Sequence, residues 1–290
     1  MKKSALLYIV LAGVLWGTSG IFVNLMSPYG FTPVQMTCMR SVVSALCMGI
    51  YLLVRDKSCF KVTLPQLMMF VLSGAAVFGT ATFYYAAIGA SSVSTAVVLM
   101  YTAPVFVMAY SVAFLGEKFN LRKAAAVVLV TVGCALVSGL VAGARFSILG
   151  TVLGLCSGLS YSAYNVVTKI QMLRGCRPLS ATFYSFSVMA VISLCVCDPV
   201  DLVQKTARNP AYLIMLIIGI GVFTCVLPYL LYTLGMREIP AGTASALGIV
   251  EPMSATLFSV VIFSEKLTGA GIVGIVLILT AVFMLSKTEE

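Results

Sequence analysis

The chain has 290 residues, of which 61% are hydrophobic and only 9% are charged. Soluble domains contain about 25% charged and about 45–50% apolar residues, so a soluble fold of this length could not bury its apolar side chains. The composition excludes an ordinary soluble enzyme, a disordered chain and a nucleic-acid-binding protein, and it predicts a membrane protein. In a soluble protein a net charge of +9 would suggest a polyanionic partner, but in a membrane protein its distribution relative to the membrane must be considered first.

Ten apolar segments follow one another along the chain, separated by short turns and charged residues. A helix needs about 20 apolar residues to cross the hydrocarbon core, and the segments do not alternate as transmembrane β-strands do. We therefore expect an all-α integral membrane protein with ten transmembrane helices. We place these helices at residues 5–26, 34–54, 65–88, 93–115, 121–141, 147–169, 179–197, 210–236, 241–264 and 268–286.

The first segment follows Lys2 and Lys3 and could be mistaken for a secretory signal. Its apolar run continues through Trp16 to Met26, which is too long for a signal peptide, and no convincing cleavage site is present. We therefore expect a transmembrane helix. With this end in the cytoplasm, 13 of the 18 Lys and Arg fall in cytoplasmic segments and four in outer segments, while Arg40 lies within a helix. The positive-inside rule then predicts a cell-membrane protein with both termini in the cytoplasm.

The two halves of the chain resemble each other. At an offset of 148 residues the matches are Tyr84–Tyr232, Thr95–Thr243, Ala96–Ala244, Leu99–Leu247, Pro104–Pro252, Ser111–Ser259 and Glu117–Glu265; at an offset of 145 they include Gly13–Gly158, Trp16–Tyr161 and Pro33–Pro178. We infer two repeats of five helices, at 5–141 and 147–286. Because five is odd, the second repeat enters the membrane from the opposite side, an arrangement that in transporters places the substrate site near the midplane between the repeats.

Several short patterns together resemble one family. They are Gly13-Val14-Leu15-Trp16-Gly17, Arg40 in the second helix, and the paired segments from Pro104 to Lys118 and from Glu251-Pro252 to Lys266. This chain resembles the EamA-type members of the drug/metabolite transporter superfamily over essentially its whole length. The resemblance implies a ten-helix secondary transporter with a central substrate cavity lined by both halves, often an exporter of amino acids or other small metabolites.

Glu251 is the sharpest functional candidate in the sequence. It lies ten residues into the helix that starts near 241, about 15 Å from the inner membrane surface and so roughly at the midplane. A carboxylate at that depth costs several kcal/mol of free energy, on the order of the values for charged side chains in a bilayer, unless it faces a cavity, is paired or is protonated. We expect it to bind a substrate ammonium group or a proton; the alternative is a structural acceptor for nearby backbone donors.

Arg40 lies about 9 Å inside the outer end of the second helix. It could bind a substrate carboxylate or pair with Glu251, or its long side chain could simply reach the outer interface. Ser185 occupies the equivalent position in the second repeat, so this charge is not duplicated.

Pro104 and Pro252 lie within predicted helices at equivalent positions. Each removes a helix hydrogen bond, which frees the carbonyls of Met100 and Gly248. These carbonyls could line the cavity and the kinks could act in gating, or the kinks could be static and satisfied by neighbours.

Aromatic and polar residues within the predicted helices complete the candidate site. We expect the substrate cavity to include Trp16, Tyr84, Tyr101, Tyr161, Asn165 and Tyr232. For any single one of them, helix packing with interhelical hydrogen bonds is the simpler explanation. The spacing of Gly150, Gly154 and Gly158, and of Gly13 and Gly17, indicates close helix packing rather than function.

The sequence contains no His and no nucleotide-binding loop of the GxxxxGK[ST] type, so it predicts no His-based metal site, no Ser-His-Asp triad and no ATP-driven step. We expect no cofactor and no enzyme activity. The partners are then a small-molecule substrate and the lipid bilayer, with proton coupling as an open possibility. Two alternatives to a metabolite transporter remain: a lipid-precursor flippase, and an intramembrane enzyme, which Asp198 and Asp201 support poorly because both are expected in an outer loop.

Overall fold

The computed structural model describes residues 2–91, 93–116, 120–137, 147–264 and 268–289, and those residues are helical apart from short turns. The α-helices are α1 (Lys2–Gly17), α2 (Ser19–Met26), α3 (Pro33–Arg55), α4 (Leu64–Ala90), α5 (Val93–Met100), α6 (Ala103–Phe114), α7 (Leu121–Val137), α9 (Ile148–Leu173), α10 (Pro178–Val196), α11 (Pro199–Thr206), α12 (Pro210–Gly221), α13 (Leu227–Gly235), α14 (Ala241–Leu247), α15 (Val250–Phe263) and α16 (Gly269–Glu289). Short 3₁₀ turns occupy Ser27–Tyr29 and Lys57–Phe60, and the π-helical turn Val222–Val226 joins α12 to α13.

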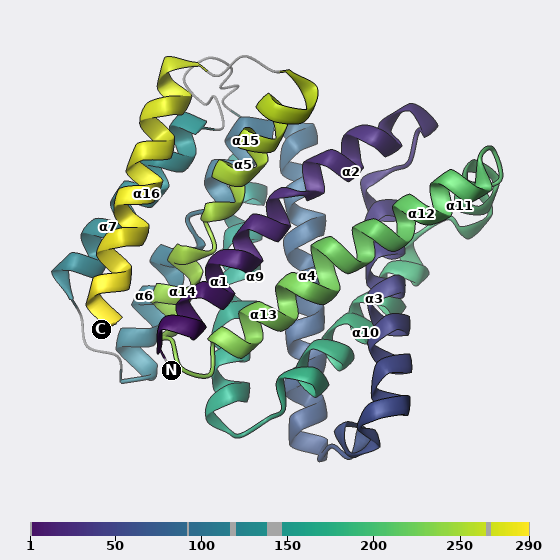
Figure 1. Cartoon of the computed structure of the whole chain (residues 1–290), viewed down its shortest axis with the longest axis horizontal. Helices are drawn as coiled ribbons and strands as arrows, with labels where there is room; N and C mark the ends of the chain where they lie inside the picture. Colours follow the sequence, from purple (N-terminus) through teal and green to yellow (C-terminus); the bar gives the residue numbers. More distant parts are fainter. Residues whose placement is uncertain (1, 92, 117–119, 138–146, 265–267, 290) are drawn as a thin grey trace.

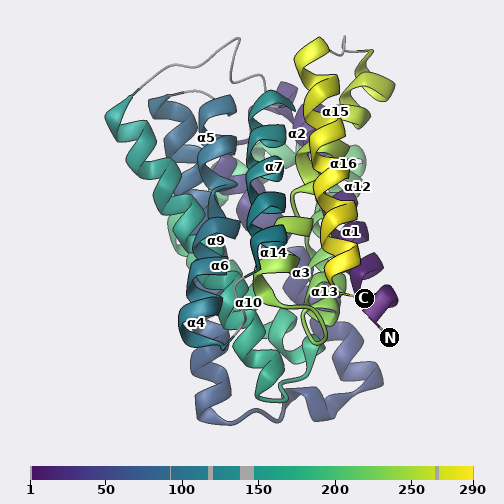
Figure 2. The same ribbon diagram turned by 90° about the vertical axis from the view of Figure 1, so that its left-hand side faces the viewer.

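The helices form one bundle, in which α4, α7 and α16 run along its length (Figure 2) and α1–α2 and α12–α13 cross it obliquely (Figure 1). Both termini lie at the same end (Figure 1), which we call the proximal end; it also holds the turn 236–240. The opposite, distal end holds the turn Ser27–Tyr29 and the start of α9. Among the described residues, seven segments are long and apolar enough to cross a membrane, which confirms an all-helical membrane protein.

Three of the predicted transmembrane helices are broken near their middle. The first divides between α1 and α2 at Thr18, the fourth between α5 and α6, and the ninth between α14 and α15. Pro104 and Pro252 each lie in the first turn of the second piece, where a missing N–H and a fixed φ are tolerated. Both predicted segments are therefore interrupted at the proline, by a break at which a new helix starts, and a role of these breaks in gating stays a prediction.

Glycines allow the two halves to pack closely. A Cβ added at Gly17 of α1 would lie 2.7 Å from the Cβ of Ser254 on α15, and one at Gly154 of α9 would lie 2.6 Å from Leu99 on α5. Gly133 of α7 and Gly274 of α16 also meet closely: a Cβ added at Gly133 would lie 2.8 Å from the carbonyl oxygen of Gly274, and one at Gly274 would lie 2.6 Å from that of Gly133. The predicted packing role of Gly17 and Gly154 is confirmed, and Gly133 and Gly274 add a contact that was not predicted.

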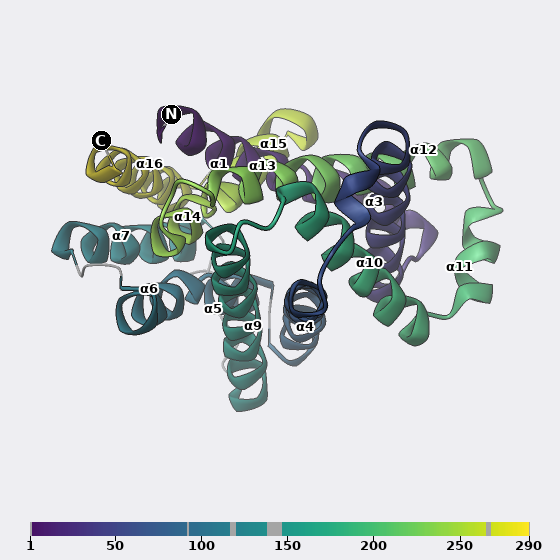
Figure 3. The ribbon, with the colours of Figure 1, turned by 90° about the horizontal axis from the view of Figure 1, so that it is seen from below.

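The segment between α10 and α12 contains a short helix, α11, where the sequence predicted only an outer loop. It lies at the edge of the bundle (Figure 3). The carboxylate of Asp198 caps it by accepting from the amides of Val200 and Asp201, at 3.0 and 3.1 Å. Pro199 occupies its first turn, so both signals for a helix start were present in the sequence.

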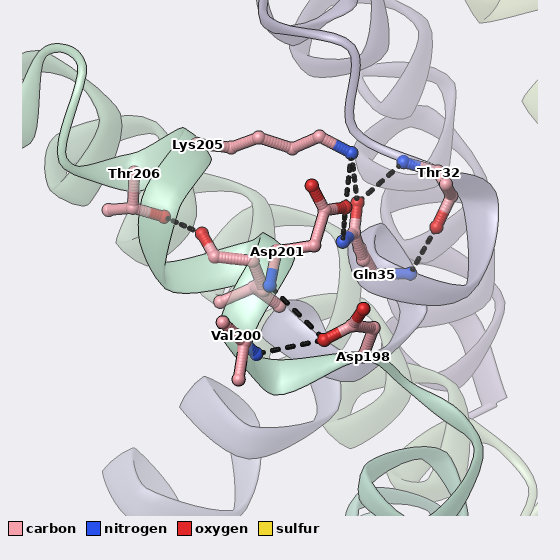
Figure 4. Close-up of polar contacts among 8 residues, drawn as sticks. Thr32, Gln35, Asp198, Val200, Asp201, Lys205 and Thr206 are labelled. Carbon is pink, nitrogen blue, oxygen red and sulfur yellow. Dashed lines mark hydrogen bonds and ion pairs between the residues drawn. The ribbon is translucent and has the colours of Figure 1, made fainter.

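Polar contacts attach α11 to the start of α3 (Figure 4). Asp201 accepts from Nε2 of Gln35 at 2.7 Å and from Nζ of Lys205 at 2.5 Å. Oε1 of Gln35 in turn accepts from the amide of Thr32 as part of the capping box that begins α3. The hydrogen bond from Lys205, followed by that from Gln35, holds the pKa of the Asp201 carboxyl below its usual value of 3.8.

Candidate functional site: a central cavity

A cavity of about 520 Å³ lies between helices of both halves. From the first half it is lined by residues of α1, α2, α3, α4, α5 and α7, and from the second by residues of α9, α12, α13 and α15, together with the break at Tyr101 and the π-helical turn. Such a volume suits a small metabolite. Of the residues predicted for the site, the lining includes Trp16, Arg40, Tyr84, Tyr101, Tyr161, Glu251 and Pro252.

Glu251 lies where two of the helix breaks meet. It is in the first turn of α15, so the positive end of that helix dipole stabilises its carboxylate. Tyr101, which lies in the break between α5 and α6, lines the same cavity. Its amide donates to the carbonyl of Gly248 at 3.1 Å, so that carbonyl is satisfied locally rather than left open. The chain thus holds a carboxylate in the cavity wall with few protein partners.

Arg40 projects into the same cavity from α3. Its Nε is buried and has no hydrogen-bond partner among the described residues. The ion pairs of the described residues join Arg177 to Asp56 and Lys205 to Asp201, so Arg40 and Glu251 face the cavity without pairing directly. The cavity therefore offers an opposite charge to each end of a zwitterion.

Aromatic side chains from several helices form part of the remaining wall. The indole of Trp16 lies 5.0 Å from the ring of Tyr229, and its buried Nε1 has no hydrogen-bond partner in the described part of the chain. Tyr84 and Tyr85 lie with ring centres 5.4 Å apart on α4. Such walls bind the apolar part of a solute, while the few polar atoms fix its orientation.

The cavity extends towards the distal end of the bundle. Its lining includes Val23 and Ile88, in the last turns of α2 and α4, and Val137 at the end of α7. Below the cavity, towards the proximal end, the helices are tightly packed, and the fully buried side chains include Ile9, Tyr232, Met236, Ile239 and Leu247. The structure is thus open on one side of Glu251 and closed on the other.

Three of the predicted site residues do not line the cavity. Asn165 and Tyr232 are completely buried beneath it, where the Tyr232 hydroxyl donates to Oδ1 of Asn165. Nδ2 of Asn165 donates to the carbonyl of Tyr161 at 2.7 Å, so both groups are occupied by the protein itself. Pro104 is buried at the start of α6. Helical spacing correctly placed these residues inside the bundle but could not give their depth.

Lys169 is a buried charge that the sequence did not reveal. It was placed in a cytoplasmic segment, yet it lies within α9, only 8% exposed. Its Nζ donates to the carbonyls of Met236 and Ile239, at 3.0 and 2.8 Å, just beyond the end of α13. A cation at a helix C-terminus satisfies carbonyls that have no helical partner.

The cavity residues Thr80, Tyr85 and Thr224 were not predicted either, because nothing in a single sequence separates them from packing residues.

The comparisons with known proteins agree with this architecture. The EamA-like transporter family matches the chain twice, at residues 3–139 and 148–287. The chain belongs to the EamA-like transporter family. Its other predicted family features, at Glu117, Lys118, Glu265 and Lys266, lie outside the described residues.

Relatives of this EamA-family chain are themselves named as transporters. An uncharacterized transporter of Archaeoglobus fulgidus is 31% identical over 95% of this chain and 94% of its own length. The uncharacterized transporter YwfM of Bacillus subtilis is 23% identical over 98% of this chain and 94% of its own length. A solved crystal structure with 19% sequence identity superposes with a TM-score of 0.81, covering 98% of this chain and 96% of that one, and so shows the same fold. The chain is a multi-pass membrane transporter.

Proposed function

We propose that this protein is a secondary transporter that exports small, polar, amino-acid-like metabolites across the cytoplasmic membrane. Ten transmembrane helices form two inverted repeats, 5–141 and 147–286, and both termini are cytoplasmic. The repeats give access to the cavity from one side of the membrane at a time. The twofold match to the family and the position of both termini at one end of the bundle support this topology.

One observation carries the choice of substrate class. Among the described residues, a cavity of metabolite size is lined by the guanidinium of Arg40 and the carboxylate of Glu251, which form no ion pair with each other. A zwitterion satisfies both: its carboxylate binds Arg40, its ammonium group binds Glu251, and its side chain lies against the aromatic walls. A charge-assisted hydrogen bond of this kind is about twice as strong as a neutral one.

Coupling to protons fits the same residues. A carboxylate that binds a substrate ammonium group in one part of the cycle can bind a proton in another, so Glu251 would exchange one for the other. Export would then be driven by the inward proton gradient, with no step that needs a nucleotide or a cofactor.

Flux measurements test this proposal. Proteoliposomes containing the purified protein are loaded with a mixed pool of labelled amino acids, and efflux is followed with and without an imposed pH gradient. We expect saturable efflux of selected amino acids that accelerates with the gradient. An efflux rate that does not change with the pH gradient would refute proton coupling. If every amino acid leaves the proteoliposomes no faster than it leaves loaded liposomes without the protein, the proposed substrate class is refuted.

A further inference from the structure

The open and closed sides of the cavity are built from equivalent segments of the two repeats. The offset of 148 residues that relates Pro104 to Pro252 also relates Tyr84 to Tyr232, Ile88 to Met236 and Val97 to Ser245. Tyr84, Ile88 and Val97 line the cavity. Their counterparts Tyr232, Met236 and Ser245 are completely buried in the closed region below the cavity, which we call the proximal seal.

Side-chain contacts between α9 and α13 form part of the proximal seal. The Tyr232 hydroxyl on α13 donates to Asn165 on α9, and its ring packs against Trp16 at 5.2 Å. One turn away, the rings of Tyr164 and Tyr229 meet edge to face at 5.5 Å. These contacts bring the two helices together beneath the cavity.

The equivalent helices on the distal side, α2 and α4, do not make the corresponding contact among the described residues. The offset of 145 residues relates Asn165 to Gly20 on α2 and Trp16 to Tyr161, so Gly20 and Tyr84 are the counterparts of the bonded pair Asn165 and Tyr232. Both Gly20 and Tyr84 line the cavity, and a Cβ added at Gly20 would meet no atom within 4 Å. There is therefore open space beside Gly20, where the second repeat has a filled contact.

The helix break at Thr18 follows the same asymmetry. The first transmembrane segment is divided into α1 and α2, and α2 leans away from the axis of α1 (Figure 1), whereas its counterpart α9 is continuous from Ile148 to Leu173. The hydroxyl and amide of Thr18 both bond to the carbonyl of Leu15, which stabilises a local turn in place of a regular helix. Thr18 is thus placed to act as the hinge of α2.

We infer that Tyr84 and Gly20 form the distal gate of this transporter. In the opposite state α2 closes onto α4, the break at Thr18 straightens, and Tyr84 occupies the space beside Gly20 against Tyr161. Tyr232 and its partners separate at the same time, so that Met236 and Ser245 line a cavity open to the proximal end. This inference rests on the proposed alternating access, because it exchanges the conformations of the two repeats.

Filling the space beside Gly20 tests the gate without knowledge of the substrate. In a background with the nine native cysteines replaced, Ser245→Cys reports opening of the proximal seal through its rate of labelling by a soluble maleimide. Gly20→Phe should fill the space that Tyr84 occupies in the opposite state, so that the distal side stays open and the proximal seal stays closed. The labelling of Ser245→Cys should then be at least about tenfold slower. Gly89→Phe is the matched control, because Gly89 also has no atom within 4 Å of an added Cβ but lies outside the cavity lining.

Each outcome decides between the gate and the proposed function. Slow labelling in Gly20→Phe, normal labelling in Gly89→Phe and recovery on adding Tyr84→Ala support the gate. Unfolding cannot imitate this result, because it would expose the buried reporter and accelerate labelling. Unchanged or faster labelling in Gly20→Phe overturns the gate and leaves the transporter proposal standing. If Ser245→Cys is unreactive even without Gly20→Phe, while Val97→Cys reacts, the proximal side never opens and alternating access itself is refuted.

Discussion

Replacing Gly17 by Ala should force apart the two helices that hold the carboxylate of the site. The new Cβ would lie 2.7 Å from the Cβ of Ser254, 2.9 Å from the amide nitrogen of Ala255 and 3.1 Å from the carbonyl oxygen of Glu251. Carbon atoms pack at about 3.5–4.0 Å, and none of these neighbours belongs to a flexible side-chain end, so α1 and α15 must separate by nearly 1 Å. Overpacking of this kind destabilises by about 1–3 kcal/mol.

Gly20→Ala is the control for this prediction. It lies three residues further along the same transmembrane segment, and its added methyl group would meet no atom within 4 Å. A glycine replaced by alanine within a helix gains up to about 1 kcal/mol, so this variant should equal or exceed the wild type in stability. Since about 1 kcal/mol corresponds to about 2–4 °C for chains of about 150–250 residues, Gly17→Ala should unfold several degrees below Gly20→Ala in one detergent. Equal melting temperatures for the two variants would show that the approach of α1 to α15 is not tight.

Two further predictions concern charged groups outside the cavity. Lys169→Met keeps the apolar stem but removes the hydrogen bonds to the carbonyls of Met236 and Ile239, so it should lower the free energy of unfolding by about 2–3 kcal/mol. Arg174→Met, at an exposed position, is the control. An equally small change in both variants would contradict this role of Lys169. The lowered pKa of Asp201 means that its contacts with Lys205 and Gln35 contribute fully above pH 3.8 and are lost as the pH falls below that value. Hydrogen exchange in α11, corrected for intrinsic rates, should therefore be constant from about pH 8 to about pH 5 and rise only in stronger acid. A rise within the neutral range, or an unchanged profile in Asp201→Asn, would refute this assignment.

The positions of the helices could be predicted from the sequence because apolar length and turn residues determine them. The segment predicted at 34–54 is α3, Pro33–Arg55, and the one predicted at 65–88 is α4, Leu64–Ala90. The breaks could not be placed, because a proline mid-segment is compatible with either a kink or a new helix. The helix α11 was missed because its eight residues, which mix polar and apolar side chains and begin with a proline, also fit a loop.

The residues of the cavity were only partly predictable. A charge in the middle of an apolar segment identifies Glu251 and Arg40, since lipid exposure of either is costly. Aromatic spacing gives the face of a helix but not its depth, so Tyr84 and Tyr232 received the same expectation although one lines the cavity and the other seals it. That difference lies in the three-dimensional packing of the helices, which residue type and spacing do not give.

The central claim is that Glu251 carries the transported solute or its coupling ion, and Glu251→Gln tests it most directly. Gln keeps the shape of the side chain but removes its charge. Efflux of labelled amino acids from proteoliposomes should fall at least about tenfold, a loss of about 1.4 kcal/mol or more at the limiting step, with the same yield of folded protein. Glu238→Gln, which removes an exposed carboxylate in the turn after α13, should leave efflux unchanged. Wild-type efflux in Glu251→Gln, with and without a pH gradient, would contradict the account.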